Sequence, residues 1–320
     1  MIPILDRTTV TADGDNYLVR TSLTNVSALR ERLSGRVVPG GWRTSCTQVS
    51  TELLKRMVED WTDEAALLAE QQREAATRAY DARQRTTDIP GLYRHQHPAV
   101  AWLREIGRGL LAFPPGAGKT RILLHAIDWE AGPALVITPR GVVRHWLREA
   151  AEIFPHRQHA MLLGTPAKRA KDYRAWLALP DHERGICVIG WGTLSRDTRL
   201  ASYGSTALAP SEREPGYLND VPLGTLVVDE AHRALNPPAK QTRAAWWLAD
   251  RAARVYAATG TPVESSPLDV WSMCRLVAAE DWPSRVRYID TWCKVELSWA
   301  GYMESVSVQP ETEALWRTLT

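Results

Sequence analysis

Short apolar runs alternate with stretches of helical spacing between about residue 89 and residue 283. The runs are nearly continuous in apolar residues, as expected of strands buried on both faces. Strands of this kind separated by helices are typical of a parallel sheet covered by helices on both sides. The pattern therefore predicts an α/β fold, with ligands at the carboxyl ends of its strands. The runs cover residues 109–112, 134–138, 187–189, 226–228 and 255–258.

The first 60 residues have a different pattern. Residues 8–23 alternate loosely between apolar and polar side chains around an Asp13-Gly-Asp-Asn16 turn, which predicts a hairpin. Residues 26–33 and 51–61 have the spacing of amphipathic helices. We therefore expect a small α+β accessory unit over residues 1–60.

The remaining segments connect or extend these two regions. Residues 62–85 are charged and rich in alanine, which predicts a helix within a connecting segment at 61–88. Residues 195–222 are rich in Ser, Pro, Gly and charge, and we interpret them as an insertion loop. The sheet domain is expected to cover residues 89–283, and residues 284–320 to lead out of it.

A glycine-rich turn follows the first predicted strand of the sheet and precedes a helix. Gly116 and Gly118 let several backbone N–H groups face one anion, and the helix N-terminus adds further donors. Lys119 is placed to reach the β- and γ-phosphates of a nucleotide, and Thr120 to offer a hydroxyl to Mg²⁺. Glycine-rich turns before helices are also common, so the turn alone leaves a purely structural interpretation open. The residues expected to hold the triphosphate are Pro115, Gly116, Ala117, Gly118, Lys119 and Thr120.

A second candidate site follows the strand predicted at 226–228. Asp229 would bind Mg²⁺ through water, and the adjacent Glu230 would orient and polarise the attacking water. Adjacent acids after a strand are not rare, but a phosphate loop in the same sheet makes a coincidence improbable. His232 could in isolation be a metal ligand.

Composition excludes several classes of protein. The net charge of +2 is small, so any nucleic-acid contact must come from local patches. The four cysteines are scattered without a CxxC pair, which argues against a zinc site or a disulfide framework. Neither a signal peptide nor an apolar run of membrane-spanning length is present, and no membrane partner is expected. We expect a cytoplasmic protein, in the host cytoplasm if it is viral.

Six segments, in chain order, resemble the first RecA-like lobe of a superfamily-two helicase, and specifically a Swi/Snf-type ATP-dependent DNA translocase. The Thr259-Gly-Thr-Pro262 motif distinguishes the Swi/Snf type from other superfamily-two branches, which usually carry Ser-Ala-Thr or Thr-Ala-Thr there. The family also lacks a glycine at the position of Phe113, where it usually has an acid, and Gly192 stands in place of another acid. Asp229 to His232 form a DEAH box. The segments are 92–96, 112–120, 134–149, 188–194, 229–237 and 258–262.

The resemblance implies a RecA-like lobe that binds ATP and Mg²⁺ and hydrolyses ATP. Gln96 would read the adenine base. The catalytic residues would be Lys119, Asp229 and Glu230, with Thr120 and Asp229 at the metal. The residues that would couple the nucleotide state to a second lobe are His232, Thr259 and Thr261.

The resemblance also implies DNA, duplex or branched, as a partner. Such enzymes track the phosphate backbone and need positive charge and N–H donors along one groove. Pro139, Arg140, Trp191, Gly192 and Thr193 lie at suitable strand ends. The region 140–174 is basic, although a solvated helix face would look the same. Its basic residues are Arg140, Arg144, Arg148, Arg157, Lys168, Arg169, Lys171 and Arg174.

The N-terminal unit has a resemblance of its own. Residues 17–20, 29–33, 39–42 and 52–54 are similar to parts of the small DNA-binding HARP module of annealing helicases. A generic accessory domain is the alternative.

A motor of this kind needs a second RecA-like lobe, which supplies arginine fingers. The sequence contains neither a second phosphate-binding sheet nor an arginine-finger motif, so we expect that lobe in cis or in trans. The chain would then be a fragment, one product of a split gene, or a truncated protein. An alternative function of a different class is a nucleotide-regulated adaptor that binds DNA or a protein without being a motor. An RNA helicase is disfavoured by the Thr-Gly-Thr-Pro form.

Overall fold

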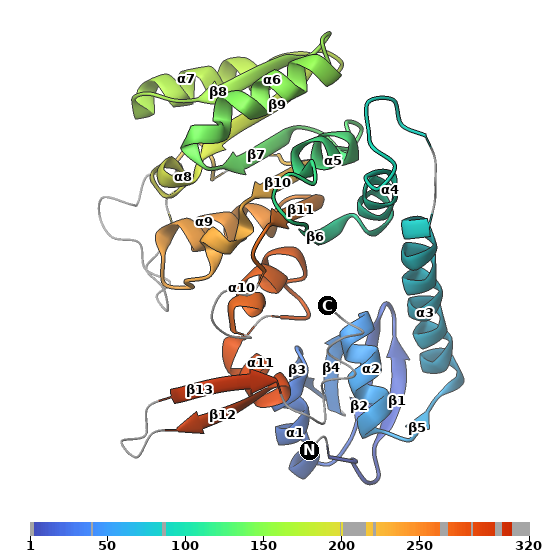
Figure 1. Ribbon diagram of the computed structural model, residues 1–320. Coiled ribbons are helices and arrows are strands. Elements are labelled where there is room, and N and C mark those ends of the chain that lie inside the picture. The colour runs from blue at the N-terminus through green and yellow to red at the C-terminus, as the bar shows by residue number, and fades with distance from the viewer. Residues whose placement is uncertain are drawn as a thin grey trace. The chain divides into compact units, whose positions relative to one another are not determined.

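The computed structural model describes residues 3–39, 41–84, 88–198, 200, 216–219, 222–262, 268–282, 284–297 and 303–308. These residues form two compact units (Figure 1). The smaller unit takes its described residues from Met1–Asp81, Ser265–Trp271 and Ala278–Thr320. The larger one takes them from Ala82–Glu264 and Ser272–Val277.

The larger unit is built on a six-stranded sheet in the order β6-β11-β10-β7-β9-β8, and all of its pairings are parallel. The α/β fold predicted from the apolar runs is therefore confirmed, and each predicted run lies in a strand. The edge strand β8 was missed because most of its side chains are partly or fully exposed, so no apolar run marks it. The strands are β6 (Arg108–Ala112), β7 (Ala134–Thr138), β8 (Gln158–Leu162), β9 (Arg184–Gly190), β10 (Thr225–Asp229) and β11 (Arg254–Thr259).

Helices cover both faces of this sheet. Alternate residues of β7 belong to two separate cores: Ala134 and Val136 to one, Leu135 and Ile137 to the other. The first core includes side chains of α4 (His97–Ile106), α5 (Lys119–Ala126) and α6 (Val143–Ile153). The second includes side chains of α7 (Pro166–Leu177), α8 (Trp191–Asp197), α9 (Lys240–Ala249) and α10 (Leu268–Val277).

The smaller unit contains a five-stranded sheet in the order β3-β4-β2-β1-β5. Its first hairpin is as predicted, because Asp13 pairs with Asn16 and Gly14 takes a left-handed φ of 60° in the turn. The helix expected over 51–61 ends at Met57 instead, and Asp60–Trp61 pairs with β1. The elements are β1 (Thr9–Asp13), β2 (Asn16–Arg20), α1 (Leu23–Arg32), β3 (Arg36–Val38), β4 (Gly41–Ser45), α2 (Gln48–Met57) and β5 (Asp60–Trp61).

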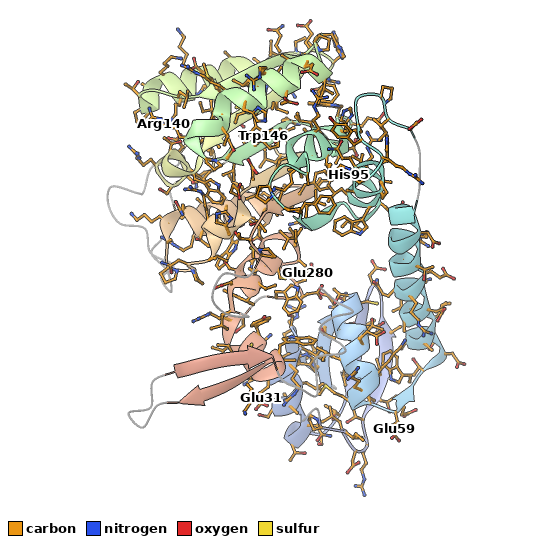
Figure 2. The ribbon with its side chains drawn as sticks, viewed as in Figure 1. Glu31, Glu59, His95, Arg140, Trp146 and Glu280 are labelled. Carbon is orange, nitrogen blue, oxygen red and sulfur yellow. The ribbon has the colours of Figure 1, made fainter. Side chains whose placement is uncertain are left out.

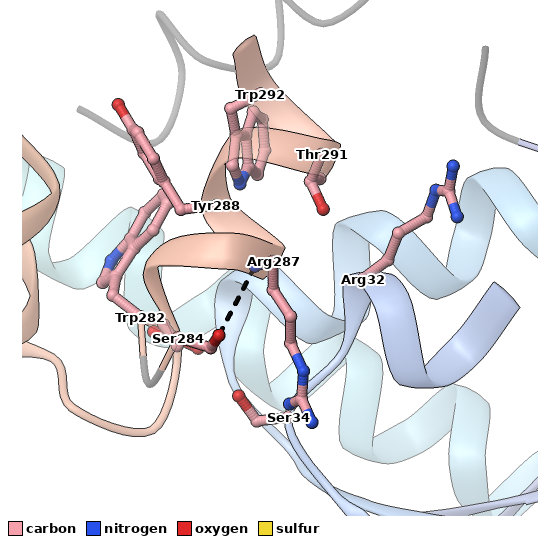
Figure 3. Close-up of a pocket in the computed structure, with 9 residues that line it drawn as sticks. Arg32, Ser34, Trp282, Ser284, Arg287, Tyr288, Thr291 and Trp292 are labelled. Carbon is pink, nitrogen blue, oxygen red and sulfur yellow. Dashed lines mark hydrogen bonds between the residues drawn. The ribbon is translucent and has the colours of Figure 1, made fainter. Parts of the chain in front are cut away.

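Helix α11 (Arg285–Trp292) belongs to the smaller unit and packs against α1. The Arg287 guanidinium donates a hydrogen bond to the Leu33 carbonyl (3.0 Å), and the Thr47 hydroxyl bonds to the Asp281 carboxylate. Trp282 packs on Tyr288 with ring centroids 5.6 Å apart, beside a cavity of about 10 Å³, room for one water molecule (Figure 3). The segment 284–320, expected to lead out of the sheet domain, thus contributes its described residues to the other unit.

The described chain also contains two short 3-10 helices, η1 (Arg140–Val142) and η3 (Ala231–Ala234), and three longer elements. The long helix α3 (Asp63–Gln84) occupies the segment predicted as a connecting helix. β12 (Cys293–Leu297) and β13 (Met303–Val308) form an antiparallel pair. Of the expected insertion loop, residues 195–197 belong to α8, whereas residues 199, 201–215 and 220–221 lie outside the described residues. Among the helices described, none combines the length and apolar character that crossing a membrane requires.

Candidate nucleotide site

The turn between β6 and α5 has the backbone of an anion-binding loop. Gly116 (φ 82°) and Gly118 (φ 76°) both take left-handed conformations that other residues rarely adopt. A Cβ atom at position 118 would also lie 2.0 Å from the Gln96 amide nitrogen, so a larger residue there would displace the Gln96 side chain. The Lys119 ammonium donates hydrogen bonds to the carbonyls of Phe113 (2.9 Å) and Pro114 (3.2 Å), which keeps it at the mouth of the loop.

The segment before α4 is docked on this loop. Gln96 is buried, and its side-chain oxygen accepts a hydrogen bond from the Tyr93 N–H (2.9 Å) while its amide donates to the Ala117 carbonyl (3.1 Å). His95 (Figure 2) lies 3.2 Å from the same carbonyl through Nε2. Arg121 of α5 adds a contact to the Gly91 carbonyl (3.2 Å). The expected adenine-recognising segment is thus attached to the loop at its Gln96 end and to α5 at its Gly91 end.

The acidic pair lies at the end of β10. Asp229 is 9% exposed, and its Oδ2 accepts hydrogen bonds from the Thr138 hydroxyl (2.8 Å) and the Trp146 indole (3.0 Å). Its Oδ1 accepts from the Glu230 N–H (3.0 Å). Glu230 itself has a left-handed φ of 51°, which is unusual for a residue other than glycine and is often found at functional sites.

The three residues expected to couple nucleotide state lie together next to Glu230. His232 Nδ1 is 3.2 Å from Glu230 Oε2, 3.0 Å from the Thr259 hydroxyl and 3.4 Å from the Thr261 hydroxyl. Within the residues that the structure describes, no group of three or more His, Cys, Asp or Glu could hold a metal ion. The contacts of His232 therefore link it to Glu230 and to the end of β11.

The end of β11 joins the loop and the acids into one site. β11 lies between β6 and β10, and Thr259 is paired with Ala112 at the start of the loop. A Cβ atom on Gly260 would lie 3.3 Å from Pro115 Cδ and 3.8 Å from the Lys119 nitrogen. The phosphate loop, the Asp229–Glu230 pair and the Thr-Gly-Thr turn therefore share the carboxyl edge of the sheet.

The residues expected to contact DNA leave the same edge from two neighbouring strands. Thr138 is paired with Gly190, so Pro139 and Arg140 emerge beside residues 191–193. Arg140 and Gly192 are exposed, and Arg140 is visible in Figure 2. The Trp191 indole is 1% exposed and donates to the Asp229 carbonyl (2.9 Å), so its side chain packs behind the acidic pair instead of facing solvent.

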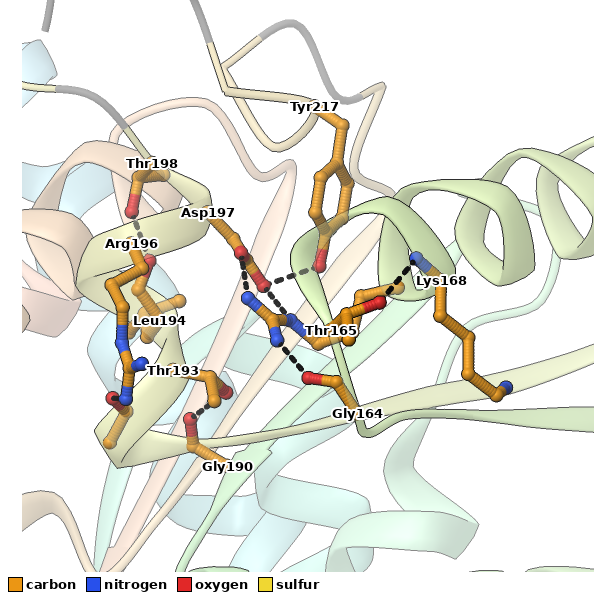
Figure 4. A network of polar contacts seen from close by, with 12 residues as sticks. Gly164, Thr165, Lys168, Gly190, Thr193, Leu194, Arg196, Asp197, Thr198 and Tyr217 are labelled. Carbon is orange, nitrogen blue, oxygen red and sulfur yellow. Dashed lines mark hydrogen bonds and ion pairs between the residues drawn. The ribbon is translucent and has the colours of Figure 1, made fainter. Parts of the chain in front are cut away.

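Two of the basic residues between 140 and 174 serve the fold. Arg157 donates hydrogen bonds to the carbonyls of Asp181 (2.9 Å) and Arg184 (2.7 Å). Arg169 is buried and pairs through Nε with the Asp197 carboxylate (2.7 Å), which also accepts a bond from the Tyr217 hydroxyl (Figure 4). Arg169 is not available to a nucleic acid and Arg157 is held by the fold, so the basic surface of this region is smaller than its sequence indicates.

A parallel sheet with a phosphate loop after one strand and an acidic pair after another defines a RecA-like lobe. The family described as the SNF2-related domain matches residues 95–315, and the chain belongs to that family. The resemblance found in the sequence motifs is thereby confirmed.

Several known proteins are similar to this chain. It is 28% identical to helicase ssl-1 of Caenorhabditis elegans over 171 residues, which are 52% of this chain and 6% of that protein. It is 30% identical to the Zorya protein ZorD of Escherichia coli O139:H28 over 200 residues, covering 56% of this chain and 18% of that protein. The chain thus spans less than a fifth of either relative. Among solved structures, the Sulfolobus solfataricus SWI2/SNF2 ATPase core in complex with dsDNA matches with a TM-score of 0.49 and 23% identity, over 63% of this chain and 39% of that one.

Proposed function

We propose that the larger unit is the ATP-binding and ATP-hydrolysing lobe of a DNA-dependent ATPase of the helicase-like translocase type. The observation that supports this most is the convergence of the phosphate loop, Asp229–Glu230 and the Thr-Gly-Thr turn at one sheet edge. Membership of the SNF2-related family points the same way.

The residues at this edge fit a nucleoside triphosphate with Mg²⁺. Two left-handed glycines and the N-terminus of α5 offer N–H donors to phosphate oxygens, and Lys119 adds a positive charge. Thr120 and Asp229 would hold the metal, which when bound would neutralise part of the phosphate charge. Glu230 would orient the attacking water and accept its proton. His232, Thr259 and Thr261 would relay the state of this site to a second lobe.

DNA is the proposed macromolecular partner, as duplex or branched DNA. Arg140 is exposed, Gly192 has open space around it, and the two leave adjacent strand ends. An exposed guanidinium and accessible backbone N–H groups are the contacts that phosphates use most. Pro139 and Thr193 would complete this surface.

Fast hydrolysis would also require a second RecA-like lobe, in cis or in trans. An arginine supplied across the nucleotide is worth about 10³–10⁵ in rate in related phosphoryl-transfer enzymes. The described residues contain one phosphate-binding sheet, and Arg121 beside its loop is paired with Glu149 (2.8 Å).

The test is steady-state ATP hydrolysis by residues 1–320, with and without duplex DNA, before and after a second RecA-like lobe is supplied. We expect slow turnover that DNA stimulates little, and DNA-dependent turnover once the second lobe is present, because stimulation works by closing two lobes on each other. Nucleotide-dependent DNA binding without hydrolysis, even with the second lobe, would instead identify a non-motor adaptor.

A further inference from the structure

Two tryptophan side chains donate hydrogen bonds to Asp229, one to its carboxylate and one to its main-chain carbonyl. The Trp146 indole donates to the carboxylate oxygen Oδ2 (3.0 Å), and the Trp191 indole donates to the main-chain carbonyl (2.9 Å). Trp146, labelled in Figure 2, is fully buried on α6, and Trp191 is buried at the start of α8. An indole N–H can only donate, so each bond requires an acceptor at that position.

The hydrogen bonds on the carboxylate are distributed unequally. Oδ2 accepts two, from Trp146 and from the Thr138 hydroxyl (2.8 Å), whereas Oδ1 accepts one, from the Glu230 N–H (3.0 Å). A carboxylate oxygen has about two lone-pair directions. The two donors on Oδ2 therefore fill that oxygen, and one direction on Oδ1 is left for a further ligand.

We propose that Trp146 is a positioning residue for the magnesium site, and that it acts together with Thr138. By filling Oδ2, the indole and the hydroxyl fix the rotation of the Asp229 carboxylate and present Oδ1 to the water shell of the metal. This inference rests on the proposed function, because it assumes that Asp229 takes part in holding Mg²⁺ beside ATP. Partners that orient a metal-binding group in this way commonly change metal affinity by 10–100-fold when they are removed.

Two pairs of variants separate this role from simple packing. Trp146→Phe removes the indole N–H and keeps an aromatic ring, and its control is Trp176→Phe. Trp176 is also buried in the larger unit, but its indole donates to the Gly185 carbonyl (3.2 Å), away from the acids. Thr138→Val removes the hydroxyl at nearly constant shape, and its control is Thr225→Val on β10. The Thr225 hydroxyl is buried and has no hydrogen-bond partner within the part of the chain that the structure describes.

The measurement is the affinity for the fluorescent analogue mant-ATP, once with Mg²⁺ and once with EDTA. We expect the gain in affinity that Mg²⁺ gives to fall by about 10-fold in Trp146→Phe and Thr138→Val, with the affinity in EDTA unchanged. Trp176→Phe and Thr225→Val should keep the wild-type gain. If Trp146→Phe does not fold, the comparison of the two threonine variants decides.

The outcomes distinguish the inference from the function on which it rests. A wild-type gain in both Trp146→Phe and Thr138→Val would overturn the positioning role and leave the nucleotide site standing. A wild-type protein that gains nothing from Mg²⁺ would overturn the proposed function, and the inference with it.

Discussion

The side-chain amide of Gln96 donates a hydrogen bond to the carbonyl of Ala117, 3.1 Å away inside the phosphate loop. Its oxygen is occupied as well, by the Tyr93 N–H (2.9 Å), and the side chain is 1% exposed. Gln96 is therefore a structural support of the loop in addition to its predicted role as the reader of adenine. The two roles have different consequences when the side chain is shortened.

We predict that Gln96→Ala weakens ATP binding by about 10-fold and also relaxes the preference for ATP over GTP. Loss of the bond to Ala117 loosens the loop, and a hydrogen bond of this kind typically contributes about 0.5–1.5 kcal/mol. Affinities for ATP and GTP, measured by calorimetry in wild type and variant, test this. If both nucleotides lose affinity equally, Gln96 supports the loop without reading the base.

Glu230→Gln should retain ATP binding and stop hydrolysis. The amide keeps the shape of the side chain but cannot accept a proton from water, and general-base catalysis typically contributes about 10²–10⁴ in rate. The readout is steady-state turnover in a protein with both lobes, beside nucleotide affinity. Glu59→Gln, an exposed change in the smaller unit, is the control. Turnover near the wild-type rate would remove Glu230 from the catalytic role.

Much of this site could be predicted from the sequence, because its parts are local. Each motif can be recognised in the sequence as polar or glycine residues directly after a predicted strand. This holds for the glycines of the loop, the acids after β10 and the Thr-Gly-Thr turn after β11. Parallel strands then bring those ends to one edge. The side chains that donate hydrogen bonds to the Asp229 carboxylate could not be predicted from the sequence, since Thr138 and Trp146 are 91 and 83 residues away from it in the chain. The sequence also could not show which arginines of 140–174 are buried, because Arg169 finds Asp197 only in the folded chain.

The buried pair of Arg169 and Asp197 should matter for stability more than for function. Arg169→Met leaves the Asp197 carboxylate buried without its counter-charge, and removing one partner of such a pair costs about 3–5 kcal/mol. Lys168→Met on the same helix is the control, because the Lys168–Asp172 pair is exposed and such pairs contribute about 0–1 kcal/mol. Urea denaturation of both variants tests this. Equal stabilities would contradict the assignment of Arg169 to the fold.

The smaller unit should lose stability as the pH rises from about 4 to 6. Burial raises the pKa of Asp281 to about 6, and the neighbouring Glu280 adds to the rise, against the Thr47 hydrogen bond that lowers it. The folded state favours the protonated carboxyl. Asp281 therefore does not lower the free energy of unfolding below its ordinary pKa, and it lowers this free energy by the full amount above pH 6. Asp281→Asn stays neutral and should therefore be more stable than wild type at pH 7, by about 3 kcal/mol.

Unfolding free energies of wild type and Asp281→Asn between pH 4 and pH 8 test this dependence. The two should converge at the acidic end, and Glu59→Gln should follow wild type throughout. A wild-type profile in Asp281→Asn would show that another group causes the pH dependence.

The central claim, that the carboxyl edge of the larger sheet binds Mg·ATP, is tested most directly by calorimetry on Lys119→Ala. The Lys119 ammonium lies at the mouth of the loop, on the carbonyls of Phe113 and Pro114. Its removal takes away the positive charge facing the β- and γ-phosphates. Lys171→Ala, an exposed change on α7, controls for the loss of net charge. We predict measurable Mg·ATP binding by wild type and Lys171→Ala and none by Lys119→Ala, whereas unchanged affinity in Lys119→Ala would contradict the assignment of the site.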